Sequence, residues 1–259
     1  MSIQQTFDDA LLNRDWAAAE EALAQGADIN HRRGARLVTP IYVAMEKQDM
    51  EATQWLKDRG ADINIPDARG DSILMGIIQR NDWFLFKTVV DWGFDFSTPN
   101  QDGVTPVLQA ALFKHGTEYM RELLRRGAEA NHRASSGTNA LLVAAGSDLF
   151  EMVRMLFEVG ADPLAINHQG HNLIHAAVQS KNPKLLKLVL DETEQVRADG
   201  KLNINYSSHG NSKPIAFAAA GLLNPTMVVL LMRAGADLNA RDADLFGSGV
   251  PPLSVLALV

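Results

Sequence analysis

Short apolar stretches with helical spacing come in pairs along the chain, and a few polar residues interrupt each pair. One pair covers residues 105–113 and 117–125, with the polar break Lys114-His115-Gly116 between them. Apolar residues that recur at intervals of three and four mark one face of a helix. We therefore expect each pair to form a helix, a turn and a second helix.

A glycine mark follows the second helix of each pair. The segment Gly-Ala-Asp-Ile-Asn at residues 26–30 returns unchanged at residues 60–64 and in altered form further along. The first five glycines of the series are spaced by 34, 33, 34 and 33 residues, and the series comprises Gly26, Gly60, Gly93, Gly127, Gly160 and Gly235. Glycine suits the left-handed position at the end of a helix, because it has no Cβ. The mark therefore predicts a helix end in every repeat.

A second mark with the same period precedes the first helix of each pair. Its clearest forms are Thr39-Pro40 and Thr105-Pro106. A threonine oxygen accepts from the free N–H groups of a helix start, and proline fits the first helical position. After an N-terminal helix pair over residues 3–25, this mark predicts six helix pairs, which begin near Thr39, Ser72, Thr105, Asn139, Asn172 and Lys213.

The segment between the glycine mark and the next first helix is rich in turn-forming residues. Residues 64–71, Asn-Ile-Pro-Asp-Ala-Arg-Gly-Asp, are one example. Asparagine, aspartate, proline and glycine favour tight turns over continued helix. Each such segment is expected to form a projecting hairpin loop.

The two marks together resemble the ankyrin repeat family, whose unit of 33 residues carries a T-P-L-H-x-A motif and a G-A-D-x-N motif. The resemblance covers almost the whole chain. It departs from the family in that the motif histidine survives only as His175, and the other repeats carry Tyr42, Met75, Leu108, Leu142, Ala216 and Ser254 there. The resemblance implies an all-α ankyrin-repeat solenoid of stacked helix-turn-helix units with projecting hairpin loops. Neighbouring units in such a solenoid bury each other's apolar faces.

We expect one ankyrin-repeat domain over residues 1–259. Residues 1–30 are predicted to form a capping helix pair, and residues 31–249 to form six divergent repeats with an insertion near residues 191–201. Residues 250–259 begin a seventh repeat and end in an apolar run. This half-repeat either covers the last interface of the array or pairs with another chain, and a monomer is the expected state.

Composition narrows the function. The chain has 46% hydrophobic and 21% charged residues and a formal net charge of -7, which argues against nonspecific binding to nucleic acid or to an anionic membrane. It has no cysteine, so disulfides, thiolate metal sites and cysteine nucleophiles are excluded. No targeting segment is visible and no apolar run is long enough to span a bilayer, so we expect a cytoplasmic protein.

Motifs of catalysis are missing from the sequence. It contains no glycine-rich phosphate loop, no nucleophile elbow and no H-E-x-x-H zinc signature. His168, His171 and His175 have a spacing compatible with a metal, but the first two fall in a predicted hairpin tip and the third at the motif position. We therefore expect no enzyme activity, no metal and no cofactor. An enzyme or a small-ligand or metal sensor with a site in the groove is the alternative.

Charged and aromatic residues offer two candidate surfaces. The basic segment His31-Arg32-Arg33 is followed by Arg36, and Arg69, Arg80 and Arg133 extend it if equivalent positions of stacked repeats align. These residues form either a recognition stripe or a series of solvated hairpin tips. Trp83 and Trp92 occupy positions that are polar in most ankyrin repeats, which permits a second interface on the outer face. Phe86, with Leu85, Val89 and Val90, has the spacing of a core residue.

The resemblance also implies where a partner binds, because ankyrin-like proteins use the concave side formed by hairpin tips and first helices. The residues carried over to that surface are Arg33, Arg36, Glu46, Lys47, Arg69, Asp71, Gln79, Arg80, Asp102, Leu112, Phe113, Arg133, Ser135, His168, Gln169, His171, Gln179 and His209. Leu112 and Phe113 provide an apolar centre among polar neighbours, as protein interfaces commonly have. The expected function is noncatalytic binding of a partner protein, and an inhibitor or immunity-type protein is one concrete form of it.

Overall fold

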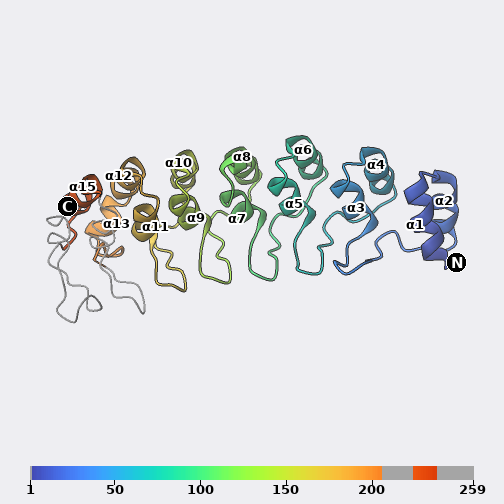
Figure 1. Cartoon of the computed structure of the whole chain (residues 1–259), viewed down its shortest axis with the longest axis horizontal. Coiled ribbons are helices and arrows are strands. Elements are labelled where there is room, and N and C mark those ends of the chain that lie inside the picture. Colours follow the sequence, from blue (N-terminus) through green and yellow to red (C-terminus); the bar gives the residue numbers. More distant parts are fainter. Residues whose placement is uncertain (1, 206–223, 238–259) are drawn as a thin grey trace. The chain divides into compact units, whose positions relative to one another are not determined.

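The computed structural model describes residues 2–205 and 224–237 (Figure 1). The chain divides into two compact units, Met1–Ala110 and Ala111–Val259, which are treated separately below as unit 1 and unit 2. Over the described ranges the structure is helical with hairpin loops, and the pairing of Arg33 with Val38 is an isolated β-bridge. None of the helices in these ranges has the length and apolar character needed to cross a membrane.

Unit 1 is built from antiparallel helix pairs. Its helices are α1 (Ile3–Asn13), α2 (Trp16–Ala24), α3 (Pro40–Glu46), α4 (Met50–Asp58), α5 (Ile73–Gln79) and α6 (Trp83–Asp91), and α7 (Pro106–Ala111) ends at the unit boundary. Helices α1 and α2 pack together, as do α3 with α4, α5 with α6, and α3 with α5. Ile41, Leu74, Ile78 and Phe86 are fully buried between them. The prediction that Phe86 belongs to the core is confirmed.

Unit 2 repeats this arrangement. Its helices are η1 (Lys114–Gly116, a 3-10 turn), α8 (Thr117–Arg125), α9 (Ala140–Gly146), α10 (Phe150–Glu158), α11 (Leu173–Gln179), α12 (Pro183–Glu192), α13 (Glu194–Ala198) and α15 (Pro225–Arg233). Helix α9 packs on both α10 and α11, and α12 packs on α10, α11 and α15. In both units the loops project on the side of the first helices, away from the second helices (Figure 1).

The two sequence marks act at the helix ends as predicted. Thr39 caps α3 by accepting the backbone N–H of Tyr42, and Pro40 occupies the first turn. After α4 the chain passes through Gly60 with φ +83°, the left-handed conformation that a side chain disfavours. These local signals explain why α3 starts and α4 ends where the period of about 33 residues places them.

Successive repeats are joined by the asparagine of the glycine mark. The Oδ1 atom of Asn30 accepts the backbone N–H of Asp62 at 2.8 Å in unit 1, and Asn131 does the same for Asp162 at 2.7 Å in unit 2. Hairpin loops are joined as well, because the Gln101 N–H donates to the carbonyl of Arg69 at 3.1 Å. The predicted repeat architecture with projecting hairpins is thus confirmed within each unit.

One predicted helix is shorter than expected. The stretch predicted as helical through Phe113 ends at Ala111, since Phe113 adopts an extended backbone and Lys114–Gly116 tightens into η1. The extra residues near 191–201 hold the end of α12 and the short helix α13. The helix start near Lys213, the residues Ala216 and Ser254, and the half-repeat at 250–259 lie outside the described residues.

Candidate partner-binding groove

An open cavity of about 440 Å³ lies in unit 1 between hairpin loops and first helices. We call it the unit-1 groove. It contains seven of the residues predicted to bind a partner, namely Arg36, Glu46, Arg69, Asp71, Gln79, Arg80 and Asp102. The other lining residues are Tyr42, Met75, Gly76, Asn100, Val104 and Gln109.

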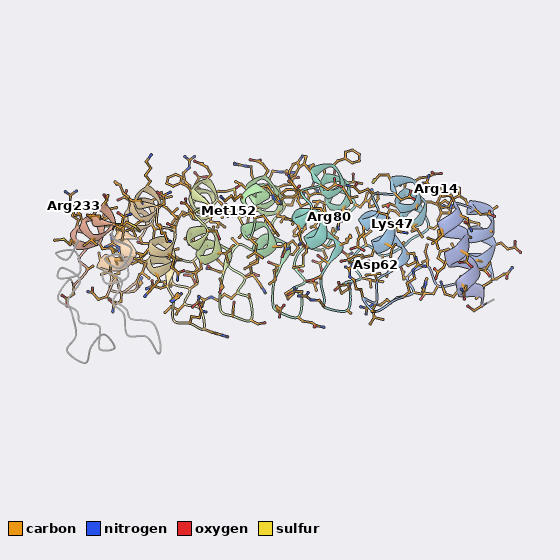
Figure 2. All side chains as sticks on the ribbon, viewed as in Figure 1. Arg14, Lys47, Asp62, Arg80, Met152 and Arg233 are labelled. Carbon is orange, nitrogen blue, oxygen red and sulfur yellow. The ribbon has the colours of Figure 1, made fainter. Side chains whose placement is uncertain are left out.

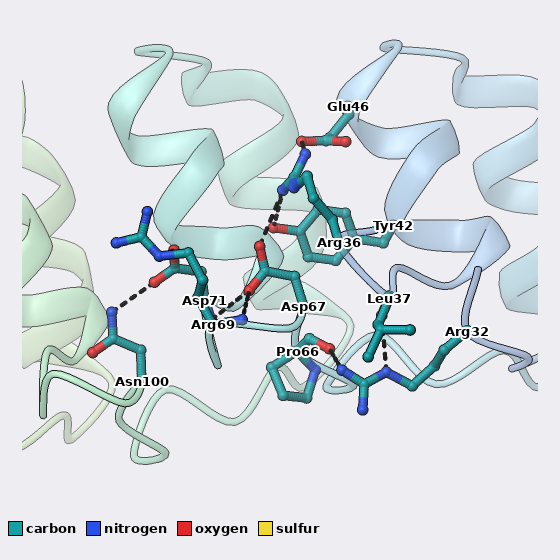
Figure 3. A network of polar contacts seen from close by, with 10 residues as sticks. All are labelled: Arg32, Arg36, Leu37, Tyr42, Glu46, Pro66, Asp67, Arg69, Asp71 and Asn100. Atoms are coloured by element: carbon teal, nitrogen blue, oxygen red, sulfur yellow. Dashed lines mark hydrogen bonds and ion pairs between the residues drawn. The ribbon is translucent and has the colours of Figure 1, made fainter. Parts of the chain in front are cut away.

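Arg36 is the centre of a polar network at one end of this groove (Figure 3). Its guanidinium donates to Glu46 Oε1 at 2.8 Å and to Asp67 Oδ2 at 3.2 Å. It also donates to the Tyr42 hydroxyl at 3.2 Å and lies 5.4 Å from the centre of that ring. Arg36 is therefore already paired with groups of its own chain, although its side chain is 54% exposed.

Asp67 fixes the hairpin that carries Arg69 and Asp71. Its side chain is only 4% exposed. One carboxylate oxygen, Oδ1, accepts the backbone N–H groups of Arg69 at 2.9 Å and of Asp71 at 3.0 Å, and the other accepts from Arg36. This carboxylate is a structural part of the groove wall, because every oxygen already has a donor.

Asn100 fixes the backbone of the next hairpin in the same way as Asp67 does in its own. Its Oδ1 accepts the N–H groups of Asp102 at 3.0 Å and of Val104 at 2.8 Å. Its Nδ2 donates to Asp71 Oδ1 at 2.6 Å, which ties the two hairpins together (Figure 3). The floor of the groove is thus held by hydrogen bonds within the chain before any partner binds.

The network shifts two ionisation equilibria. The hydrogen bond to Glu46, and after it the one to Asp67, raises the pKa of Arg36 above its usual range even though burial opposes the charge. Burial raises the pKa of Tyr42 to about 12, and the negative charge of Asp67 adds to this effect. Arg36 remains charged and Tyr42 remains a neutral phenol at physiological pH.

Most members of the predicted basic stripe are paired with carboxylates of the same chain. Arg33 lies 2.9 Å from Asp8 and lines a separate cavity of about 90 Å³ together with Lys47. Arg69 is 3.9 Å from Asp71 and 4.0 Å from Asp102. Carboxylates therefore neutralise most of the stripe, so the unit-1 groove carries alternating charges. Lys47 and Arg80, which are labelled in Figure 2, directly follow the last residues of α3 and α5.

Several predicted contact residues belong to unit 2. These are Leu112, Phe113, Arg133, Ser135, His168, Gln169, His171 and Gln179, whereas His209 lies outside the described residues. Leu112 is 54% exposed, and the half-buried Phe113 stacks on His115 at 5.1 Å. Arg133 pairs with Asp162 at 2.9 Å. The apolar pair and the unit-1 groove therefore occupy different units.

His171 and His175 support packing and capping at the start of α11. The rings of His171 and His175 stack 5.4 Å apart, and Asn172 and His175 form a capping box at the start of α11. Burial, with His171 alongside, lowers the pKa of His175 to about 4. Within residues 2–205 and 224–237, no three His, Asp or Glu side chains are grouped so as to hold a metal ion.

The aromatic residues of α6 divide between the core and the surface. Trp83 is 42% exposed and stacks on Phe86 at 5.3 Å, while Trp92 is half-buried with the Lys57 ammonium 6.0 Å from its ring. Phe84, to which the sequence assigned no role, is the more exposed residue at 72%. Whether this outer face is a second interface stays a prediction.

Sequence reasoning missed the residues that build the groove wall, which are Tyr42, Asp67, Gly76, Asn100 and Gln109. A signal for the hairpin caps was present in the sequence. Asp67 and Asn100 each precede a glycine by three residues, as Asn167 does in unit 2. An oxygen of aspartate or asparagine at that place accepts local backbone N–H groups in a turn.

Comparisons with known proteins agree with this architecture. Residues 74–167 match the family model for ankyrin repeats, with three copies. The mouse NF-kappa-B inhibitor delta is 26% identical over 88% of this chain and 67% of its own length. The human transient receptor potential cation channel subfamily A member 1 is 25% identical over 70% of this chain, which spans only 13% of the channel.

A solved structure gives the same fold. The crystal structure of the ankyrin repeat domain of Bcl-3, a member of the IkappaB protein family, superimposes with a TM-score of 0.65 at 21% identity. The match covers 84% of this chain and 93% of that domain. The repeats, their hairpins and these similarities lead to one conclusion: the chain has the ankyrin-repeat fold, and its residues 74–167 match the ankyrin-repeat family model.

Proposed function

We propose that the chain is a noncatalytic module that binds a partner protein, and that the unit-1 groove is its contact surface. The observation that carries this proposal is that some polar side chains of the groove hold its hairpins while others are exposed to solvent. Asp67 and Asn100 use their polar atoms internally to hold two hairpins, while Gln79 and Arg80 remain exposed at the end of α5. A rigid wall that presents free polar side chains binds with little loss of conformational entropy.

An inhibitor is the specific form of this function that we favour. An inhibitor of this kind acts by covering a surface of its partner, which requires shape and charge complementarity and no chemistry of its own. Similarity over 88% of the chain to the NF-kappa-B inhibitor delta, a protein named for inhibiting another protein, supports this form. The cytoplasmic location expected from the sequence stays a prediction.

Affinity capture from the native cell tests the proposal. The full chain is immobilised, and captured proteins are identified by mass and then measured against variants. We expect the double variant Gln79→Ala, Arg80→Ala to lose the partner while its thermal unfolding stays near that of the natural chain, because both side chains are exposed.

The matched control removes the same residue types from unit 2. Gln179 ends α11, and Arg154 is exposed and paired with Glu158 on the same helix. The variant Gln179→Ala, Arg154→Ala is expected to retain the partner. Capture that survives the unit-1 changes and is lost with the unit-2 changes would place the contact surface elsewhere and contradict the proposal.

A further inference from the structure

Arg80 differs from the other arginines of the unit-1 groove. Arg36 is engaged by Glu46 and Asp67, and Arg69 lies near two carboxylates. Of the carboxylates in the described part of the chain, none lies within ion-pair distance of the Arg80 guanidinium, which is exposed at the groove wall. The groove thus contains one cation whose charge the chain itself does not neutralise.

Gly76 makes room for this guanidinium. Arg80 follows the last residue of α5, and its side chain turns back over the helix, so that a Cβ built on Gly76 would lie 3.3 Å from Arg80 Nη1. Glycine inside a helix is unfavourable relative to alanine. The equivalent residues of α11 are Ala176 and Ser180. Of the two helices, only α5 therefore combines a glycine that leaves space for the guanidinium with an arginine that fills it.

We infer that Arg80 is the subsite for one carboxylate, carried by an aspartate or glutamate in an exposed segment of the partner protein. This inference rests on the proposed function and adds the partner's chemistry to it. A guanidinium offers paired N–H donors that match the two oxygens of a carboxylate, and such charged hydrogen bonds are the strong ones.

The rest of the groove argues against a generally acidic partner. Arg36 and Arg69 already face carboxylates of the chain, and Asp71 and Asp102 would repel further negative charge. A partner segment therefore gains from a carboxylate at one fixed position and loses from acidic residues beside it. The structure predicts a single required acid, with neutral polar neighbours facing Gln79 and Gln109.

Peptide selection tests this inference. A display library of short random peptides is selected on the immobilised full chain, and dissociation constants of enriched peptides are measured. We expect enriched peptides to share one aspartate or glutamate at a fixed position. Changing that residue to its amide should weaken binding about tenfold, or about 1.4 kcal/mol.

A double-mutant cycle locates the contact. In the variant Arg80→Ser, which copies the residue of α11, binding should fall by a similar factor, and the acid-to-amide change in the peptide should then have no further effect. The control Arg154→Ser should bind as the natural chain does. Gly76→Ala should weaken peptide binding by a smaller factor, because the added Cβ displaces the Arg80 guanidinium. It should not lower the melting temperature, because alanine favours the helix more than glycine does.

Two results overturn the inference in distinguishable ways. If groove-binding peptides carry no fixed acid, or if the acid-to-amide change costs the same in Arg80→Ser as in the natural chain, Arg80 is not a carboxylate subsite while the proposed function stands. If no enriched peptide is sensitive to the Gln79→Ala, Arg80→Ala variant, both the inference and the proposed groove fail.

Discussion

The hairpin loops at residues 67–71 in unit 1 and 167–171 in unit 2 share the same backbone hydrogen bonds but carry different side chains. In the first, the Asp67 N–H donates to the carbonyl of Asp71 at 3.0 Å; in the second, Asn167 donates to His171 at 3.1 Å. Each leading side chain also accepts two N–H groups further along its loop. The backbone design is therefore the same in both units.

The side chains added to this framework differ in charge. Asp67 is a buried carboxylate that also holds Arg36, whereas Asn167 is neutral and its hairpin leads to the stacked pair His171 and His175. The helix that follows carries Arg80 in unit 1 and Ser180 in unit 2. The comparison teaches that the hairpin needs only the oxygen acceptor and the turn, so it does not require a charged residue at the end of the helix that follows, where unit 1 has Arg80 and unit 2 has Ser180.

The largest expected difference between the units is in their response to acid. The folded chain protonates His175 only near pH 4, whereas an unfolded histidine is protonated below about pH 6.5, so the unfolded state binds more protons between these values. The stability contributed by the neutral imidazole is present above about pH 6.5. It falls by up to roughly 3 kcal/mol as the pH drops to 4.

Urea unfolding at a series of pH values measures this effect. The control is His175→Leu, because Leu108 and Leu142 occupy the equivalent positions of other repeats. That variant should lose the part of the pH dependence that lies between pH 4 and 6.5. An unchanged pH profile in His175→Leu would mean that the buried imidazole is not the group responsible.

Removing the leading side chain should affect the charged hairpin more than the neutral one. Asp67→Ala leaves two backbone N–H groups without an acceptor and removes one of the three acceptors of Arg36. We expect the free energy of unfolding to fall by about 2 to 3 kcal/mol, with little of the loss from the ion pair because Arg36 is half exposed. Asn167→Ala leaves two N–H groups, at a cost of about 1 kcal/mol. Equal losses in urea unfolding would show that the Arg36 network adds nothing to the hairpin.

The shared backbone should respond equally in both units. Gly70 and Gly137 have φ of +80° and +78°, and a Cβ on either would lie 3.1 Å from backbone of the neighbouring hairpin. Replacing either glycine by alanine should lower the free energy of unfolding by about 2 kcal/mol. Gly93→Ala should lower it by only about 1 kcal/mol, because φ is +82° there but no atom lies within 4 Å of the added Cβ. Chemical denaturation checks this order. Gly137 lies in the hairpin at residues 134–138 of unit 2, and a marked difference between Gly70→Ala and Gly137→Ala would mean that the hairpin backbones of the two units are not equivalent.

The smallest expected effect concerns the tyrosine of unit 1. Tyr42 should ionise at a pH of about 12 in an ultraviolet absorbance titration, because burial and Asp67 disfavour the phenolate. The variant Asp67→Asn should lower the pKa of Tyr42 while leaving burial as the larger cause. If Tyr42 of the natural chain titrates at the ordinary value near 10, its hydroxyl is not buried beside Asp67 as described.

Much of the fold was predictable because its signals are local. The glycine and Thr-Pro marks lie within a few residues of the helix ends that they create, as at Thr39 and Gly60. The end of α7 was missed because the polar break at residues 114–116 adds a 3-10 turn, a change that apolar spacing does not reveal.

The candidate site was predictable only in part. Alignment of repeats grouped Arg36, Arg69 and Arg80, which line one cavity of unit 1, but it treated them as one basic stripe. Which arginine meets which carboxylate depends on contacts between residues far apart in sequence, such as Arg33 with Asp8. The free charge of Arg80 could be recognised only after the other pairs were known.

Amide hydrogen exchange of the full chain, alone and with its captured partner, tests the central claim most directly. The account predicts added protection in the hairpins at residues 67–71 and 100–104 and at the end of α5, with none in the hairpin at residues 167–171. Protection confined to residues 167–171, or to the segment around Leu112 and Phe113, would contradict it.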